Sequence, residues 1–187
     1  TYGKAKVKQN VWKTSDELSL FDKIPTCAPL EVFPVEATHT DELVELAAWF
    51  WTEGHRKADS PNRIEISQSQ KANPVHCERI KLLLEKTFGP EGRVAEGGVW
   101  YQAPDLEKFY VSASATQPLL DLFEFEKPVN TVPKRPKMDF IYSMTREQMS
   151  SFVSTCIDGD GHEEVGGCRR WHQKDYRSIE ILEMCLH

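Results

Sequence analysis

Two stretches, LAAWFWTEGH (46–55) and VSTCIDGDGH (153–162), decide the fold of this chain. Each carries apolar residues at helical spacing and then ends in an acid, a glycine and a histidine. Thr40 and Thr145 precede the two stretches at the positions of helix N-caps. The repeat therefore predicts two equivalent helices, which begin after a threonine and end at an acid followed by glycine.

A second block repeats further along the chain. ISQSQKANPVHCERIKLLL (66–84) aligns with CRRWHQKDYRSIEILEMCL (168–186), and in both an amphipathic helix follows a strand. The aligned blocks share a Gln-Lys pair ahead of that helix: Gln70, Lys71, Gln173 and Lys174. Two copies of two motifs in the same order indicate an internal duplication.

Between the motifs, the first copy alternates helices with strands. RIEISQSQ is predicted as a strand, Asn73 caps a helix that stops at Gly89, and GRVAEGGVWYQ and KFYVSASA are predicted as a pair of strands. PLLDLFEF then reads as a short helix that opens at Pro118. This order predicts an α+β fold, and the family resemblance given below implies that it consists of αββαββα repeats with antiparallel sheets.

The pattern divides the chain into four parts. They are an N-terminal extension (1–37), a first repeat (38–126), a linker (127–138) and a second repeat (139–187) that stops before the counterpart of residues 92–125. We therefore expect a fragment of a longer protein with an incomplete second repeat. The linker is rich in proline and basic residues, so Lys134, Arg135 and Lys137 are predicted to form a solvated tether.

Composition excludes some classes of protein. No apolar run is long enough for a membrane span and no signal peptide precedes the repeats, which predicts a cytoplasmic protein. The five cysteines show no framework spacing, so reduced thiols are expected. The net charge of −6 opposes nucleic-acid binding, but a binding face needs only a local excess of Lys and Arg, and residues 63–81 and 168–177 provide it.

The paired helices suggest a chemistry. Small residues allow the two helices to pack closely around a pseudo-two-fold axis: Ala47, Ala48, Ser154 and Thr155. Symmetry then brings Glu53 and Asp160 together at the helix ends. Two carboxylates with neighbouring carbonyls form a hard oxygen site suited to Mg²⁺ or Mn²⁺, which bind through few carboxylates plus substrate phosphates.

LAAWFWTEG and VSTCIDGDG both resemble the LAGLIDADG motif of the homing endonucleases, and the resemblance covers about residues 40–187. It implies a monomer with internal pseudo-two-fold symmetry that cleaves double-stranded DNA with divalent metal, with antiparallel strands in the major groove. It also implies that Glu53 and Asp160 bind the metal, while Gln70, Lys71, Gln173 and Lys174 hold water and phosphate. Such domains are often embedded in an intein, so residues 1–37 are an expected border with a splicing domain.

Other interpretations stay open. Each acid, taken singly, is explained as the last residue of a helix before a C-terminal glycine. Glu53 departs from the final Asp of the motif, and Trp49 and Trp51 are bulky for it; we expect both tryptophans in the core. The alternatives are a non-catalytic regulator or RNA maturase of the same fold and a structural module with an accidental match.

Overall fold

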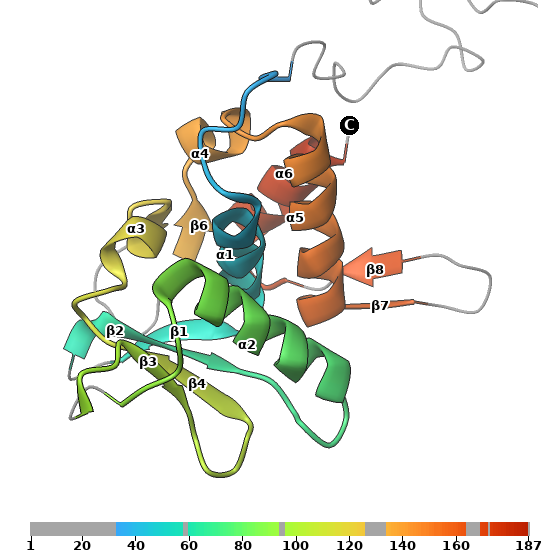
Figure 1. Cartoon of the computed structure of the whole chain (residues 1–187). Helices are drawn as coiled ribbons and strands as arrows, with labels where there is room; N and C mark the ends of the chain where they lie inside the picture. Colours follow the sequence, from blue (N-terminus) through green and yellow to red (C-terminus); the bar gives the residue numbers. More distant parts are fainter. Residues whose placement is uncertain are drawn as a thin grey trace, which may run out of the picture.

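The computed structural model describes residues 33–57, 60–93, 96–125, 134–163, 169–171 and 173–186. The extension predicted over residues 1–37 therefore lies almost entirely outside the described residues. Every helix in the described part of the chain is too short or too polar to cross a membrane. The elements form an α+β fold in which helices flank an antiparallel four-stranded sheet (Figure 1).

The first part of the chain has the predicted element order. It comprises α1 (Asp41–Glu53), β1 (Gly54–Lys57), β2 (Ser60–Ser67), α2 (Pro74–Phe88), β3 (Trp100–Gln102), β4 (Lys108–Val111) and α3 (Gln117–Leu120). The four strands pair in the order β1-β2-β4-β3, with every neighbour antiparallel. Ile64 and Ile66 of β2 and Phe109 of β4 face the helices and are fully buried.

The second part repeats the beginning of that order. After β5 (Phe123–Phe125), β6 (Lys134–Pro136) and α4 (Met138–Tyr142) come α5 (Arg146–Asp160), β7 (Gly161–Glu163), β8 (Arg169–Trp171) and α6 (Tyr176–Cys185). β7 and β8 form a two-stranded antiparallel sheet, and β5 pairs with β6 in another. A helix, a hairpin and a second helix thus occur twice along the chain.

The two long central helices start at threonine caps, as predicted. Thr40 Oγ1 accepts a hydrogen bond from Leu43 N at 3.3 Å, and Thr145 forms the full capping box with Gln148. Gln148 Nε2 also donates to His39 O and to Asp41 Oδ1, each at 2.8 Å. One side chain of α5 therefore also binds the first turn of α1, which holds the two helix N-termini together.

α1 and α5 lie side by side at the centre of the fold (Figure 1). A Cβ atom added at Gly159 would lie only 2.3 Å from Thr52 Oγ1, so the helices touch where a side chain is missing. Trp51 stacks on Phe152 with ring centroids 5.7 Å apart. Trp49 and Trp51 are buried, which confirms that both tryptophans belong to the core.

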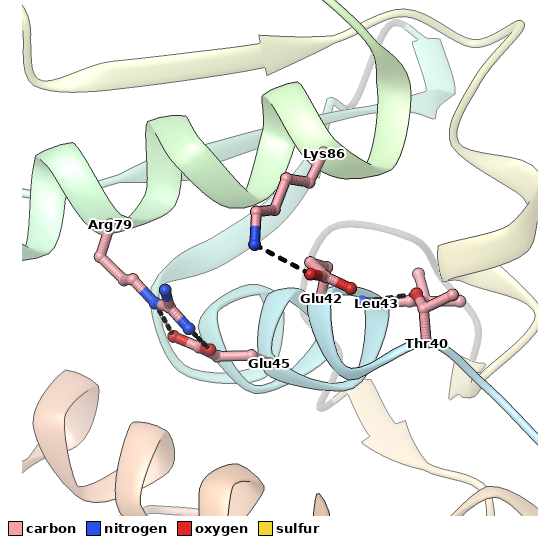
Figure 2. Close-up of polar contacts among 6 residues, drawn as sticks. All are labelled: Thr40, Glu42, Leu43, Glu45, Arg79 and Lys86. Carbon is pink, nitrogen blue, oxygen red and sulfur yellow. Dashed lines mark hydrogen bonds and ion pairs between the residues drawn. The ribbon is translucent and has the colours of Figure 1, made fainter. Parts of the chain in front are cut away.

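α2 is held against α1 by two ion pairs (Figure 2). Arg79 forms a bidentate ion pair with the buried Glu45, in which Nε lies 2.6 Å from Oε1. In the second pair, Lys86 Nζ lies 3.1 Å from Glu42 Oε1. These contacts fix the direction of α2 over the sheet. Its apolar face, formed by Cys77, Ile80, Leu83 and Leu84, is buried.

Five predicted elements differ from the structure. Two are strands that are shorter than expected: among the described residues, 92–102 forms a strand only at Trp100–Gln102, and 108–115 only at Lys108–Val111. The strand expected at 63–70 lies at Ser60–Ser67, because Gln70 and Lys71 already belong to the turn before α2. The helix expected at 118–125 ends at Leu120, and Phe123–Phe125 instead forms β5. The linker expected at 127–138 lies partly outside the described residues, and its later part forms β6 and the start of α4.

Candidate functional site

The two acids of the repeat occupy equivalent positions at the ends of α1 and α5. Glu53 and Asp160 are the last helical residues, and Gly54 and Gly161 then begin β1 and β7. A Cβ atom at Gly161 would lie 2.5 Å from Ile157 O, so only glycine lets the chain leave the helix directly into a strand. This geometry explains the glycine that follows the acid in both motifs.

The structure brings the two carboxylates into one electrostatic environment. Burial and, to a lesser extent, the nearby charge of Asp160 raise the pKa of Glu53 from 4.5 to about 7, while Lys134 opposes the shift. Burial likewise raises the pKa of Asp160, although Gln173 and Lys134 oppose that shift. Both acids also sit at helix C-termini, where the helix dipole disfavours negative charge. The site consequently favours a cation beside the acids.

A lysine from outside the two motifs reaches this site. Lys134 of β6 is partly buried, and its Nζ lies 5.6 Å from the centroid of the Phe50 ring. Burial lowers the pKa of Lys134 to about 8, while the charges of Asp160 and Glu53 oppose the shift. The amine therefore exchanges between charged and neutral forms within about a pH unit of neutrality.

Its neighbour Arg135 is buried and makes two hydrogen bonds to Asp175, each at 2.7 Å. Asp175 is the N-cap of α6, and the contact with Arg135 lowers the pKa of its carboxyl to about 2. The prediction that Lys134 and Arg135 belong to a solvated tether is therefore wrong. Pairing of β6 with β5 draws this basic segment into the fold, and no local sequence signal predicts that pairing.

Among the predicted polar residues, Gln173 lies at the site. Its Nε2 donates to Asp160 Oδ2 at 2.7 Å from the loop between β8 and α6. Lys71 and Lys174 are exposed and Gln70 is half-buried. Within the described ranges, none of these three makes a hydrogen bond or ion pair with either acid.

Strand register changes which residues correspond between the two copies. Gly54 pairs with Ile66, and Gly161 pairs with Trp171. Two residues beyond each partner lie Gln68 and Gln173, so the register matches Gln173 with Gln68 rather than with Gln70. The second hairpin is shorter than the first, and sequence alignment does not show where its residues are missing. This difference in length changes the counterpart of Gln173 from Gln70 to Gln68.

The Gln68 side chain is nevertheless placed differently from that of Gln173. It is buried, and its Oε1 accepts hydrogen bonds from Ser69 N at 2.9 Å and Asn73 Nδ2 at 3.0 Å. Its Nε2 is buried without a partner among the described residues. In the part of the chain that the structure describes, Glu53 thus lacks the amide contact that Asp160 has.

The donors at this site suit a hard divalent cation. Two carboxylates and the amide oxygen of Gln173 are oxygen ligands of the kind that Mg²⁺ accepts, and Mg²⁺ leaves its other positions to water and substrate phosphate. Within the described part of the chain, no three His, Cys, Asp or Glu side chains gather as a complete metal site. The protein would therefore hold the ion only in part, through Glu53, Asp160 and Gln173.

A separate hollow of about 660 Å³ opens between α1, α2 and α5, beside the Glu45–Arg79 pair of Figure 2. It is wide open to solvent, and none of the four site residues lines it. The raised pKa values identify the helix ends as the better candidate, because perturbed carboxyls collect at functional sites. No protein-family model matches this chain, and no curated protein matches it.

Proposed function

We propose that this chain is a metal-dependent endonuclease of the LAGLIDADG homing type that hydrolyses phosphodiester bonds of double-stranded DNA. The observation that carries the proposal is the convergence of Glu53, Asp160, Gln173 and Lys134 at the ends of two packed helices. A pair of acids that repel each other in a half-buried site is costly to a fold. Binding a divalent cation offsets that cost.

The duplicated architecture supports the same assignment. α1, β1, β2 and α2 match α5, β7, β8 and α6 in order, and the acid-Gly junction falls at the same point of each copy. We infer a pseudo-two-fold relation between the copies, with α1 and α5 beside its axis. Two scissile phosphates on opposite DNA strands are related by such an axis, so one acid from each copy suits a duplex substrate.

The side chains have distinct roles in the proposed reaction. Glu53 and Asp160 would hold the metal ion, and Gln173 orients the Asp160 carboxylate. When bound, Mg²⁺ polarises the phosphodiester and neutralises the leaving 3′ oxygen. Lys134, with a pKa of about 8, donates to a phosphate oxygen when charged and accepts a proton from water when neutral.

The outer face of the four-stranded sheet provides the DNA surface in this proposal. Ile64 and Ile66 point to the helices, so Arg63 and Glu65 of β2 point the other way, because side chains alternate along a strand. Lys108 Nζ lies 3.2 Å from Glu65 Oε1 and compensates its charge. The face also carries an aromatic and basic group: Arg93, Tyr101 and Tyr110. A two-stranded or larger ribbon of this kind fits the major groove.

Cleavage of a supercoiled plasmid tests the proposal. The plasmid carries the two DNA sequences that flank the coding segment of this chain, joined directly to each other. Nicked and linear products are measured with Mg²⁺ and with EDTA. We expect cleavage only with Mg²⁺, and Asp160→Asn should lower its rate by about a thousandfold or more while sparing duplex binding. Asp158→Asn is the matched control, because Asp158 is exposed on the same helix. This variant should cleave the plasmid at the normal rate. Unchanged cleavage by Asp160→Asn contradicts the role of the acid pair.

Lys134 favours a second candidate, a non-catalytic DNA-binding regulator or RNA maturase of the same fold. Its ammonium group compensates both acids without a metal ion. In that case the chain binds duplex DNA or structured RNA, but neither Mg²⁺ nor Mn²⁺ produces nicked plasmid. Binding without nicking in the same assay therefore favours the second candidate.

A further inference from the structure

The apolar face formed by α6 and its C-cap residue Leu186 matches the buried face of α2, but part of it is exposed. Aligning the helices at their N-caps, Asn73 and Asp175, pairs Cys77 with Ile179, Ile80 with Leu182, Leu83 with Cys185 and Leu84 with Leu186. The four α2 residues are at most 1% exposed, whereas Ile179 is 37% and Leu186 58% exposed. Leu182 alone is as fully buried as its counterpart. The same apolar pattern thus has a partner in the first copy and lacks one in the second.

In the first copy, the partner is the hairpin formed by β3 and β4. β4 adds to the free edge of β2, where Phe109 pairs with Ile66. β3 then lies beyond β4, and its fully buried Trp100 donates from Nε1 to Gly89 O at the end of α2, at 2.7 Å. Both strands are needed, since β4 extends the sheet and β3 reaches the helix.

The second copy presents the same edge without that hairpin. β8 corresponds to β2, and Trp171 corresponds to Ile66 through the glycine pairing of each sheet. β8 pairs with β7 on one side, and within the described ranges no strand pairs with its other side. In Figure 1 the β7–β8 hairpin extends alone from the end of α5, whereas β2 lies inside the larger sheet. An open strand edge beside an apolar helix face is a typical site for strand addition.

We propose that β8 and α6 form a docking surface for an antiparallel β-hairpin with apolar and aromatic side chains on one face. One strand of the hairpin, the counterpart of β4, pairs with β8 and places an apolar residue opposite Trp171. The other strand, the counterpart of β3, covers Ile179 and Leu186. This proposal does not depend on the nuclease assignment, because it rests only on the exposed face, the strand edge and their counterparts in the first copy.

A hairpin fits this surface better than a second copy of the chain. β8 has three residues, so direct pairing of two β8 edges would form a very short ladder. The exposed polar residues of α6, which include Arg177, Glu180 and Glu183, border the apolar stripe and limit its width. A narrow stripe beside a short edge has the shape of one hairpin.

The test uses the full chain and a synthetic peptide of residues 98–113, which spans β3 and β4. Amide hydrogen exchange is measured with and without the peptide. We expect exchange at residues 169–171 and along α6 to slow by about tenfold or more, because pairing protects strand-edge amides. In a second arm the same segment is tethered after His187, which raises its effective concentration.

Matched variants identify the surface. Leu186→Asp should abolish the protection, whereas Glu183→Gln, an exposed position on the same helix, should keep it. A peptide with Ser at the positions of Phe109 and Val111 should also fail to protect. The proposal is overturned if neither arm protects β8, if protection survives Leu186→Asp, or if light scattering shows that this face instead joins two copies of the chain.

Discussion

The two helix-hairpin-helix units of this chain have the same local pattern and different surroundings. In the first, β3 and β4 complete a four-stranded sheet and bury the apolar face of α2. In the second, β7 and β8 form a sheet of two strands, and α6 keeps part of its apolar face exposed. The threonine N-caps of α1 and α5 and the acid-Gly junctions are nevertheless alike. Local sequence is therefore enough to specify the unit, while burial depends on what packs against it.

The largest expected effect contrasts Leu84 with Leu186. Leu84→Ala should lower the free energy of unfolding by about 2–5 kcal/mol, because it leaves a cavity in a packed core. Leu186→Ala should change it by no more than about 0.5 kcal/mol, because that side chain is largely in solvent. Urea denaturation of both variants measures the difference. Equal losses would mean that α6 is covered as α2 is.

An intermediate effect contrasts the N-caps of α6 and α2. Asp175 accepts hydrogen bonds from Ser178 N and Oγ and pairs with the buried Arg135, so Asp175→Ala should cost about 2 kcal/mol. Among the described residues, the Asn73 side chain makes no cap bond and donates to Gln68, so Asn73→Ala should cost about 0.5–1 kcal/mol. Thermal unfolding of the two variants gives the order. A larger loss for Asn73→Ala would contradict the geometry of the two caps.

The last contrast concerns the pH dependence of the stability that Glu53 contributes. The pKa of folded Glu53 is raised from 4.5 to about 7, so the folded chain holds a proton that the unfolded chain releases in this window. The free energy of unfolding contributed by Glu53 therefore falls as pH rises from about 4.5 to 7. In Glu53→Gln the free energy of unfolding should fall less with pH. The stability of the variant relative to the original chain should therefore increase as pH rises. Urea titrations at several pH values measure this difference, and Glu147→Gln, at an exposed position, is the control. If the free energies of unfolding of Glu53→Gln and the original chain change with pH in parallel, the raised pKa is contradicted.

Much of the fold follows from the sequence because its signals are local. The N-caps at Thr40 and Thr145 and the helix ends at Gly54 and Gly89 depend on neighbouring residues, and the structure confirms them. The limits of β2 and the extra strand β5 are less predictable. They depend on pairing between strands that are distant in sequence, and propensity does not reveal it.

The candidate site was predictable only in part, for the same reason. The repeat alone places Glu53 and Asp160 at matching helix ends. Lys134 joins them because β6 pairs with β5, and Gln68 replaces Gln70 as the counterpart of Gln173 because one hairpin is shorter. Both differences come from strand register, which composition and spacing leave open.

The close contact between Thr52 and Gly159 has a further consequence for the geometry of the helix ends. Gln148 joins the N-terminal ends of α1 and α5. The contact between Thr52 and Gly159 sets the spacing of their C-terminal ends. Because Gly159, the residue before Asp160, has no β-carbon, the two helices approach closely at this point. Helix packing therefore determines the spacing of the two carboxylates before any ion or substrate binds.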